Sequence, residues 1–288
     1  MIEITGKTKL TGLLGQPVAH SISPAMHNKS FELNHLDYVY LAFDVAPDQL
    51  SHAVSFLKET GCVGYNLTMP HKRAIIPYLD ELTPAARLAG AVNTVLLRDD
   101  GTLLGHTTDG IGFWRSQNEI GYNHIGQTVT LLGTGGAATA IMVQGALDGV
   151  KKINVFKRKN STFEEAQKMI ETIRSNTDCE LQLLDLANLR LLRECIEESS
   201  ILINATNVGM EPDIENSIIH DSSLFSSHLL VSDIIYHPRN TKFLQLAQSQ
   251  GCMTSNGLYM LLYQGAASFK MWTGKEMPTE TIKELYFQ

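Results

Sequence analysis

The sequence has few cysteines, no cysteine pairs and no long apolar run. The four cysteines, Cys62, Cys179, Cys195 and Cys252, are widely spaced and form no Cys-x-x-Cys pair. Their spacing excludes a zinc knuckle and a disulfide framework, and it fits a reducing compartment. The first fifteen residues lack the apolar core of a secretory signal, and no uninterrupted apolar stretch approaches the ~18 residues of a membrane span. We therefore expect a soluble, cytoplasmic protein.

The sequence also lacks an excess of basic residues over acidic ones. The formal net charge of the 288 residues is -7, which argues against a protein that binds nucleic acid through its phosphates. Hydrophobic residues make up 43% of the chain and charged residues 18%, which is typical of a globular protein and not of a disordered one. The length suggests two domains. A small-molecule ligand, with no membrane partner, is therefore the expected partner class.

The first part of the chain alternates short β-type runs with helical patterns. Strands are expected over residues 9–15, 38–45, 63–67 and 91–97, and helices from Ser23 and over 49–60. Pro70 and Pro84 stand where further helices should begin, because proline fits the first turn of a helix. Such alternation predicts a mostly parallel sheet with crossover helices.

A second α/β series begins near Thr128. Strands are expected over residues 128–132, 152–156, 180–184, 200–204 and 229–235, which is the spacing of a doubly wound nucleotide-binding domain. The series is expected to end near Gly251. The apolar pattern from Gly257 to Trp272 predicts a helix that returns to pack on the first domain. The fold class is therefore α/β with two domains.

A glycine-rich loop follows the first strand of this second series. In TVTLLGTGGAATA a β-type run leads directly into a turn and then into good helix formers, and the turn residues are Gly133, Thr134, Gly135, Gly136 and Ala137. Gly133 and Gly135 occupy the first two glycine positions of a dinucleotide fingerprint, and Ala138 the third. The segment predicts a dinucleotide site at a helix N-terminus, and an ordinary βα turn is the alternative.

The end of the following strand bears on the choice of cofactor. A site that prefers NAD usually has Asp or Glu there to bind the ribose 2′-hydroxyl. Here the residues are Lys157, Arg158, Lys159 and Asn160, whose cations suit the 2′-phosphate of NADP. A solvated basic turn is the alternative interpretation, so both NADP and NAD remain expected cofactors.

Four other segments gather polar residues where a loop should meet the end of a strand. Ser21 and Ser23 precede Pro24 and could bind a carboxylate at a helix N-terminus, although Ser23 could instead be a plain N-cap. Asn66 and Thr68 follow an apolar strand and precede Lys72, a candidate acid/base in the first turn of a helix.

The remaining two segments each contribute one residue. Asn93 stands inside an otherwise apolar strand, where a buried amide must find partners. Asp109 precedes a glycine, so an Asp-Gly turn is its simplest explanation. His20, His27, His71 and His106 lie near the motifs, but their spacing fits no common metal-ligand set, and we expect no metal.

Taken in order, these motifs resemble those of the shikimate dehydrogenase family. They read GQPVAHSISPAMHN, GYNLTMPHK, AGAVNTV, TTDGIGF, LLGTGGAATA, NATNVGM, DIIYHPRNTKFL and NGLYMLLYQGAASFKMWTG. The resemblance covers nearly the whole chain, and DELTPAARLAGAVNT with MLLYQGAASFKMWTGK resembles the quinate/shikimate branch in particular. It implies reversible NAD(P)-dependent reduction of 3-dehydroshikimate to shikimate in aromatic amino-acid (chorismate) biosynthesis.

The resemblance also implies a fold and residue roles. It implies an N-terminal α/β substrate domain over residues 1–110, a Rossmann dinucleotide-binding domain over 111–255, and C-terminal helices over 256–288 that pack on the first domain, with the active site in the cleft between domains. The implied roles are catalysis for Lys72 and Asp109; the substrate carboxylate for Ser21 and Ser23; its hydroxyls for Thr68, Asn93 and Gln264; and the cofactor wall for Asn207, residues 234–237 beginning with Ile234, and Gly257.

Two departures and two alternatives qualify this interpretation. Thr107 stands where many members have Asn, and the turn at 157–161, KRKNS, matches neither the Asn-Arg-Thr of the NADP branch nor the Asp that the quinate/shikimate branch often has at position 160. One alternative is an enzyme that also acts on quinate. The other is a non-catalytic nucleotide-sensing module on the same fold. A homodimer is what family membership makes plausible.

Overall fold

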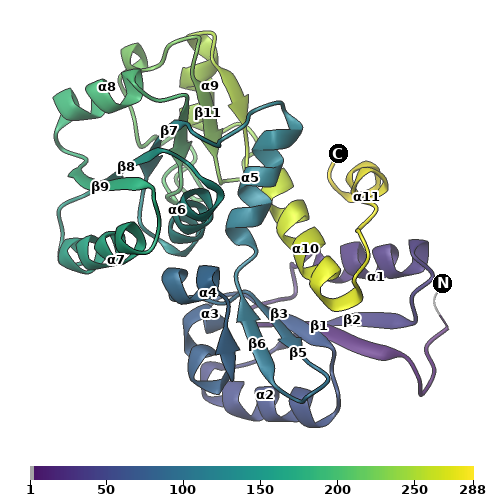
Figure 1. Ribbon diagram of the computed structural model, residues 1–288. Helices are drawn as coiled ribbons and strands as arrows, with labels where there is room; N and C mark the ends of the chain where they lie inside the picture. The colour runs from purple at the N-terminus through teal and green to yellow at the C-terminus, as the bar shows by residue number, and fades with distance from the viewer. Residues whose placement is uncertain (1–2) are drawn as a thin grey trace. The chain divides into compact units, whose positions relative to one another are not determined.

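The computed structural model describes residues 3–288, which divide into two compact units (Figure 1). The first unit contains the chain up to Thr108 together with Leu262–Gln288, and the second unit is Asp109–Leu261. The C-terminal segment therefore returns to the first unit, which confirms the α/β architecture expected from the sequence. The functional domain boundaries expected after residues 110 and 255 stay a prediction.

The first unit is built on a six-stranded sheet in the order β2-β1-β3-β5-β6-β4. Its strands are β1 (Lys9–Gly15), β2 (Tyr38–Asp44), β3 (Gly64–Leu67), β4 (Glu81–Leu82), β5 (Thr94–Leu97) and β6 (Leu103–His106). Its helices are α1 (Ser23–Leu33), α2 (Leu50–Glu59), α3 (His71–Ala74), α4 (Pro84–Ala89), most of α10 (Leu258–Thr273), α11 (Thr279–Tyr286) and the short 3-10 helices η1 (Pro47–Gln49) and η2 (Ile76–Tyr78).

This sheet is mixed, and three of its five strand pairings are parallel, as the expectation of a mostly parallel sheet requires. Strand β1 pairs in parallel with β2 and β3, and β4 with β6, but β5 runs antiparallel to both β3 and β6. Strands β5 and β6 form a hairpin whose turn contains Gly101 with φ +80°. A hairpin reverses the chain without a crossover helix, so β6 follows β5 directly and runs antiparallel to it.

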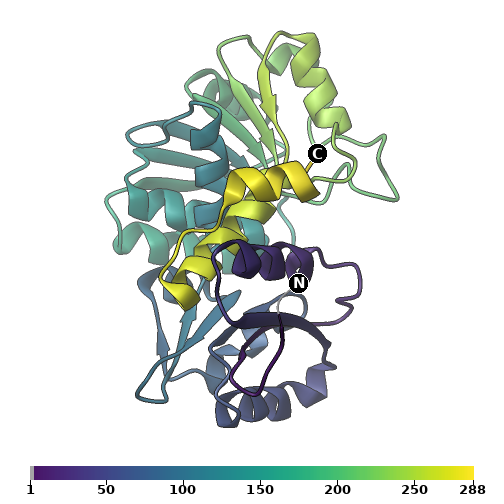
Figure 2. The same cartoon turned by 90° about the vertical axis from the view of Figure 1, so that its right-hand side faces the viewer.

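Helices cover both faces of the first sheet (Figure 1). Helix α2 buries Leu50, Val54 and Leu57, whose i, i+4, i+7 spacing forms one apolar stripe. On the other face the rings of Phe31 on α1 and Phe269 on α10 lie 5.2 Å apart, and both views place the yellow C-terminal helices beside α1 (Figures 1 and 2).

Two contacts fix these helices to the strands. A Cβ on Gly64 would lie 2.2 Å from Nε1 of Trp272, which donates a hydrogen bond to the Val95 carbonyl at 2.9 Å. Asn28 of α1 accepts a hydrogen bond from Tyr40 N at 2.8 Å and donates one to Tyr40 O at 2.9 Å. Asn28 thus occupies the backbone groups of Tyr40 on the edge strand β2 and fixes that residue against α1.

The second unit contains an all-parallel sheet in the order β12-β11-β10-β7-β8-β9. Its strands are β7 (Thr128–Leu132), β8 (Lys152–Lys157), β9 (Glu180–Asp185), β10 (Ile201–Asn204), β11 (Leu230–Asp233) and β12 (Met253–Ser255). Its helices are α5 (Asp109–Glu119), α6 (Gly136–Asp148), α7 (Phe163–Ser175), α8 (Leu189–Glu197), α9 (Lys242–Ser249) and the 3-10 helix η3 (Ser222–Leu224). Numbered within the unit, the order is 3-2-1-4-5-6, that of a Rossmann domain.

The five expected strands are confirmed, and the expectation that the series ends near Gly251 is wrong. Strand β12 adds a sixth member at the edge of the sheet, paired in parallel with β11. It has only three residues, of which Met253 is exposed. A segment of this length is too short to show the alternation of apolar and polar residues that predicts a strand, so β12 was not predicted from the sequence.

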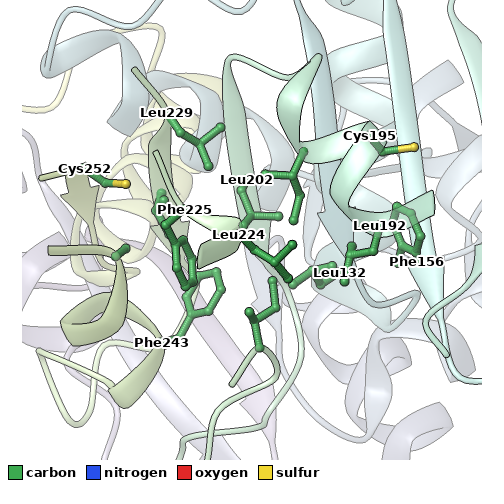
Figure 3. Packing of buried hydrophobic residues seen from close by; sticks show 14 of the residues in the cluster. Leu132, Phe156, Leu192, Cys195, Leu202, Leu224, Phe225, Leu229, Phe243 and Cys252 are labelled. Carbon is green, nitrogen blue, oxygen red and sulfur yellow. The ribbon is translucent and has the colours of Figure 1, made fainter. Parts of the chain in front are cut away.

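One core cluster of the second unit lies between its central strands and helices α8 and α9 (Figure 3). It joins Leu132 of β7 and Leu202 of β10 to residues of α8 and α9, and the rings of Phe225 and Phe243 meet edge to face with centroids 5.6 Å apart. This packing fixes the strand ends from which the loops described below emerge. Within residues 3–288 no helix is long and apolar enough to cross a membrane.

Candidate functional site

Ser21 and Ser23 lie together at the start of α1. Ser23 is the first residue of the helix, the N-cap position is Ile22, and no side chain caps the helix. The simple N-cap explanation of Ser23 is therefore wrong. Instead, the Ser23 backbone N–H donates to Ser21 Oγ at 3.3 Å.

Thr68 and Lys72 lie just beyond β3. Thr68 follows the strand, and its carbonyl accepts a hydrogen bond from His71 N at 2.9 Å. Lys72 is in the single turn of α3, and its carbonyl accepts a hydrogen bond from Val92 N at 2.8 Å. This backbone bond holds the lysine next to the residue that precedes Asn93.

Asn93 lies just before β5, which corrects the expectation that it stands inside a strand. Its Oδ1 accepts a hydrogen bond from Thr108 N at 2.8 Å, and its Nδ2 donates to Thr108 Oγ1 at 2.9 Å. These bonds tie Asn93 to the chain beyond the end of β6, so its side chain is satisfied outside the strand ladder. Asn93 Nδ2 also donates to Gln264 Oε1 of α10 at 3.3 Å, which brings two predicted substrate residues together.

A buried hydrogen-bond network connects Asn93 and Gln264 to residues that were given no role in the site from the sequence. They are Tyr40, Asn66, Thr94, Thr108 and Ser268. Tyr40 donates to Asn66 Oδ1 at 2.9 Å, and Asn66 Nδ2 donates to Asn93 O and Ser268 Oγ, both at 3.0 Å. Burial raises the pKa of the Tyr40 phenol, so its hydroxyl remains a donor.

The sequence held weak signals for this network. Asn66 lies inside β3 between Tyr65 and Leu67, both buried, and a polar residue in such a run needs partners. Ser268 lies four residues after Gln264 and therefore on the same face of α10. Neither signal names the partner, because Asn66 and Ser268 are 202 positions apart.

Three of the four histidines near the motifs have structural partners or apolar surroundings, and His20 is exposed. His71 is 2.8 Å from the Val45 carbonyl and His106 Nδ1 is 2.8 Å from Thr83 Oγ1. His27 is fully buried, and burial lowers its pKa to about 3. In the part of the chain from residue 3 onward, no group of three or more His, Cys, Asp or Glu side chains is arranged to hold a metal ion.

In the second unit the glycine loop forms the turn from β7 into α6. Gly133 has φ +111°, and a Cβ there would lie 2.8 Å from the carbonyl of Ala205, which follows β10. Gly135 is the N-cap of the thirteen-residue α6, with no side-chain cap, and no atom lies within 4 Å of a Cβ on Gly135 or Gly136. Thr134 lies between Gly133 and Gly135, and Ala137 is in the first turn of α6.

This open, uncapped helix start fits a dinucleotide. Strands β7 and β10 are neighbours at the point where the strand order reverses, which is where open α/β sheets bind their ligands. The first N–H groups of a helix and its dipole favour an anion, and the missing side chains let a pyrophosphate approach the backbone.

The basic turn after β8 has an internal structure of its own. Lys157 Nζ donates to Asn160 Oδ1 at 3.0 Å and to Thr162 Oγ1 at 2.8 Å, whereas Arg158 and Lys159 are exposed. Lys157 and Asn160 therefore stabilise the turn itself, which leaves Arg158 and Lys159 as the cations presented to solvent.

Asn207, Ile234 and Gly257 lie on loops beyond β10, β11 and β12. A Cβ on Gly257 would lie 1.8 Å from the Ile234 carbonyl, so only glycine fits, and Asn207 accepts a backbone bond from Met210 at 3.2 Å. Asp233, at the end of β11, accepts hydrogen bonds from Asn204 Nδ2, Ile235 N and Thr241 Oγ1 at 3.1, 3.0 and 2.7 Å. Burial raises the pKa of Asp233 to about 6, against the effect of these three donors.

Asp109 is the first residue of α5, so the Asp-Gly turn is not the explanation of this pair. The following glycine has a packing reason, because a Cβ on Gly110 would lie 2.2 Å from the Ala140 carbonyl of α6. Asp109 belongs to the second unit and directly follows Thr108, whereas Lys72 belongs to the first.

Comparisons with known proteins agree with these features. A model of the shikimate dehydrogenase substrate binding domain matches residues 13–95, and one of the shikimate 5′-dehydrogenase C-terminal domain matches residues 257–285. The chain is 49% identical over 284 residues to a Listeria monocytogenes (serotype 4b, strain F2365) protein named shikimate dehydrogenase (NADP(+)), covering 99% of this chain and 97% of that protein.

Two further relatives cover the chain equally well. An Escherichia coli (strain SMS-3-5 / SECEC) quinate/shikimate dehydrogenase is 43% identical over 284 residues, covering 99% of this chain and 98% of the relative. A crystal structure of Listeria monocytogenes shikimate 5-dehydrogenase in complex with shikimate and NAD is 48% identical, has a TM-score of 0.95, and covers 98% of this chain and 97% of its own. The chain therefore belongs to the shikimate dehydrogenase family.

Proposed function

We propose that the chain catalyses the reversible NAD(P)-dependent reduction of 3-dehydroshikimate to shikimate. The observation that supports this proposal is the buried network of the first unit, which runs from Tyr40 through Asn66 to Asn93 and Gln264. Its hydroxyl and amide groups are of the kind that binds a polyhydroxylated ring.

The substrate contacts are assigned by residue type. Ser21 and Ser23, at the start of the eleven-residue α1, would bind the substrate carboxylate with support from the helix dipole. Thr68, Asn93 and Gln264 would bind the ring hydroxyls. Because the Asn93 amide is fixed by Thr108 and donates toward Gln264, its orientation is set before substrate arrives, which lowers the entropy lost on binding.

Proton transfer is assigned to Lys72, with Asp109 as the second member of the pair. Negative charge develops on the substrate oxygen as the carbonyl carbon is reduced, and an ammonium group stabilises that charge and donates the proton. In the oxidation direction the same amine accepts the proton from the hydroxyl. The backbone bond between Lys72 and Val92 holds the lysine where it adjoins the hydroxyl-binding Asn93.

The nicotinamide cofactor supplies the hydride when it is bound. Gly133, Thr134, Gly135, Gly136 and Ala137 would hold its pyrophosphate. The turn with Lys157, Arg158, Lys159 and Asn160 would receive the ribose, and Asn207, Ile234 and Gly257 would complete the wall. The exposed cations Arg158 and Lys159 favour NADP, and the absence of a carboxylate at 160 agrees with that preference.

Four parallel assays test the proposal, each following the absorbance of reduced nicotinamide with shikimate or quinate and with NAD or NADP. Turnover of shikimate is expected, faster with NADP. Turnover of quinate would widen the substrate range to that in the name of the E. coli relative. Cofactor binding without turnover in any assay would contradict the proposal and favour a nucleotide-sensing module.

A homodimer and a cytoplasmic location are further proposals from the sequence. Light scattering of the purified chain on a sizing column tests the first, with a mass near twice 31.8 kDa expected. Cell fractionation tests the second.

A further inference from the structure

Ser268 connects helix α10 to the sheet of the first unit. The residue is fully buried, and its Oγ lies 2.8 Å from Thr94 Oγ1 and 3.3 Å from Thr108 Oγ1, and accepts a hydrogen bond from Asn66 Nδ2 at 3.0 Å. Its Oγ also lies 3.1 Å from the Gln264 carbonyl oxygen, one helical turn earlier. One hydroxyl thus joins β3, β5 and the end of the β6 segment to the turn of α10 that carries Gln264.

The partners of Ser268 are the residues that hold the Asn93 amide. Thr94 Oγ1 donates to Asn93 Oδ1 at 3.0 Å, and Thr108 donates to the same oxygen from its backbone N–H at 2.8 Å. Because Asn93 Oδ1 can only accept, the Thr94 hydrogen is used in that bond, and the single Ser268 hydrogen is then donated to Thr94 Oγ1 at 2.8 Å and not to the Gln264 carbonyl at 3.1 Å. This relay keeps the Asn93 oxygen turned toward Thr108 and its NH2 group toward Gln264.

We propose that Ser268 is a positioning residue for substrate binding, which fixes the amides of Asn93 and Gln264 relative to each other. The proposal rests on the proposed function, because it assigns those two amides to substrate hydroxyls. Ser268 itself does not touch substrate. Its effect is therefore on the alignment of two groups that bind the hydroxyls in both the ground state and the transition state, which predicts a change in KM larger than the change in kcat.

The experiment measures shikimate KM, kcat and NADP Kd for the wild type, Ser268→Ala and Ser30→Ala. Ser30 is a matched control, since it is also a fully buried helical serine, and its hydroxyl donates to the carbonyl four residues earlier, Met26 O, at 2.7 Å. Ser268→Ala is expected to raise the shikimate KM about tenfold, with kcat within about threefold and NADP Kd unchanged. Ser30→Ala is expected to leave all three constants near the wild type.

A second measurement separates positioning from a general loss of structure. In an Asn93→Ala background the amide that Ser268 orients is absent, so Ser268→Ala is expected to add little further increase in KM. A purely structural role would instead give two increases that multiply. The conservative variant Ser268→Cys retains a weak donor and acceptor, and its KM is expected to lie between those of wild type and Ser268→Ala.

The outcomes separate the two proposals. A wild type that turns over neither shikimate nor quinate would refute the proposed function, and the role of Ser268 with it. An active wild type with an unchanged KM in folded Ser268→Ala would refute the Ser268 proposal alone. Multiplying effects with Asn93→Ala, or loss of folding by circular dichroism in both the Ala and the Cys variants, would show that Ser268 is only a structural residue.

Discussion

The imidazole ring of His27 lies parallel to the phenol ring of Tyr40, with centroids 4.4 Å apart and planes 6° apart. Both rings are buried, and Phe31, Phe269 and Trp272 surround the imidazole. Neither imidazole nitrogen has a hydrogen-bond partner among residues 3–288, so a proton on this ring would be an uncompensated buried charge. The ring therefore supports the Tyr40 end of the network only in its neutral form.

Acid should destabilise the protein through His27. Burial lowers the His27 pKa to about 3, so between pH 6.5 and 3 the unfolded chain takes up a proton that the folded chain does not. Stability from this group is present above pH 6.5 and is lost as pH falls. Between pH 7 and pH 5 the free energy of unfolding should fall by about 2 kcal/mol more in wild type than in His27→Phe, measured by urea titration. In the control variant His52→Phe, which changes an exposed histidine, the free energy of unfolding should depend on pH as it does in the wild type.

Asp233 should act in the opposite direction. Its pKa is raised to about 6 in the folded state, so its contribution to stability is greatest below the unfolded pKa of ~4 and is lost as pH rises to 6. Relative to wild type, Asp233→Asn should therefore gain about 2 kcal/mol in free energy of unfolding between pH 4.5 and pH 7. Urea titrations at the two pH values check this, and a constant difference would mean that Asp233 does not titrate in this range.

Turnover should depend on Lys72 while cofactor binding should not. Lys72→Ala removes the proposed proton donor, so kcat should fall by at least ~10²-fold. NADPH binding, followed by nicotinamide fluorescence, should keep its wild-type Kd, because the residues proposed to bind the cofactor are in the second unit. Lys58→Ala on α2, an exposed lysine paired with Asp80, is the control and should retain full activity. A near-normal kcat in Lys72→Ala would remove the lysine from the mechanism.

Alanine substitutions at the two glycines Gly133 and Gly135 of the β7–α6 loop should differ in their effects on Tm and on cofactor affinity. A methyl group at Gly135 meets no atom within 4 Å, so Gly135→Ala should lower Tm by only ~2–4 °C, yet it would obstruct the approach of the pyrophosphate. NADP Kd should rise about tenfold or more. Gly133→Ala, with φ +111° and a carbonyl 2.8 Å from the new Cβ, should lower both Tm and affinity much further. Equal Tm losses in the two variants would contradict this distinction.

Discrimination between NADP and NAD should depend on Arg158 more than on Lys157. The Lys157 ammonium is engaged by Asn160 and Thr162, whereas Arg158 is exposed and can bind a phosphate with two parallel hydrogen bonds. Arg158→Ala should raise the NADP Kd about tenfold while changing the NAD Kd little. Arg190→Ala, which removes an exposed arginine of α8 in the same unit, should change neither constant. Equal weakening of both cofactors would place the 2′-phosphate elsewhere.

The sequence by itself determined the α/β class, the five main strands of the second unit, the glycine loop and the residue types of the candidate site. These features depend on local patterns: strand periodicity, a glycine where φ must be positive, and an uncapped helix start after a strand. The positions of Ser21, Ser23, Thr68 and Lys72 at the starts of helices and ends of strands follow from the same local rules.

Only the tertiary structure decided which residues are hydrogen-bond partners. Asn93 meets Gln264 across 171 positions, Asn66 meets Ser268 across 202, and Lys157 bonds to its own turn where a phosphate contact was expected. The hairpin of β5 and β6 and the three-residue β12 were likewise set by the neighbours they pair with. Local periodicity indicates which face of a helix or strand is polar. The packing of elements far apart in the chain determines which polar groups form hydrogen bonds, and the network on which the proposed function rests depends on that packing.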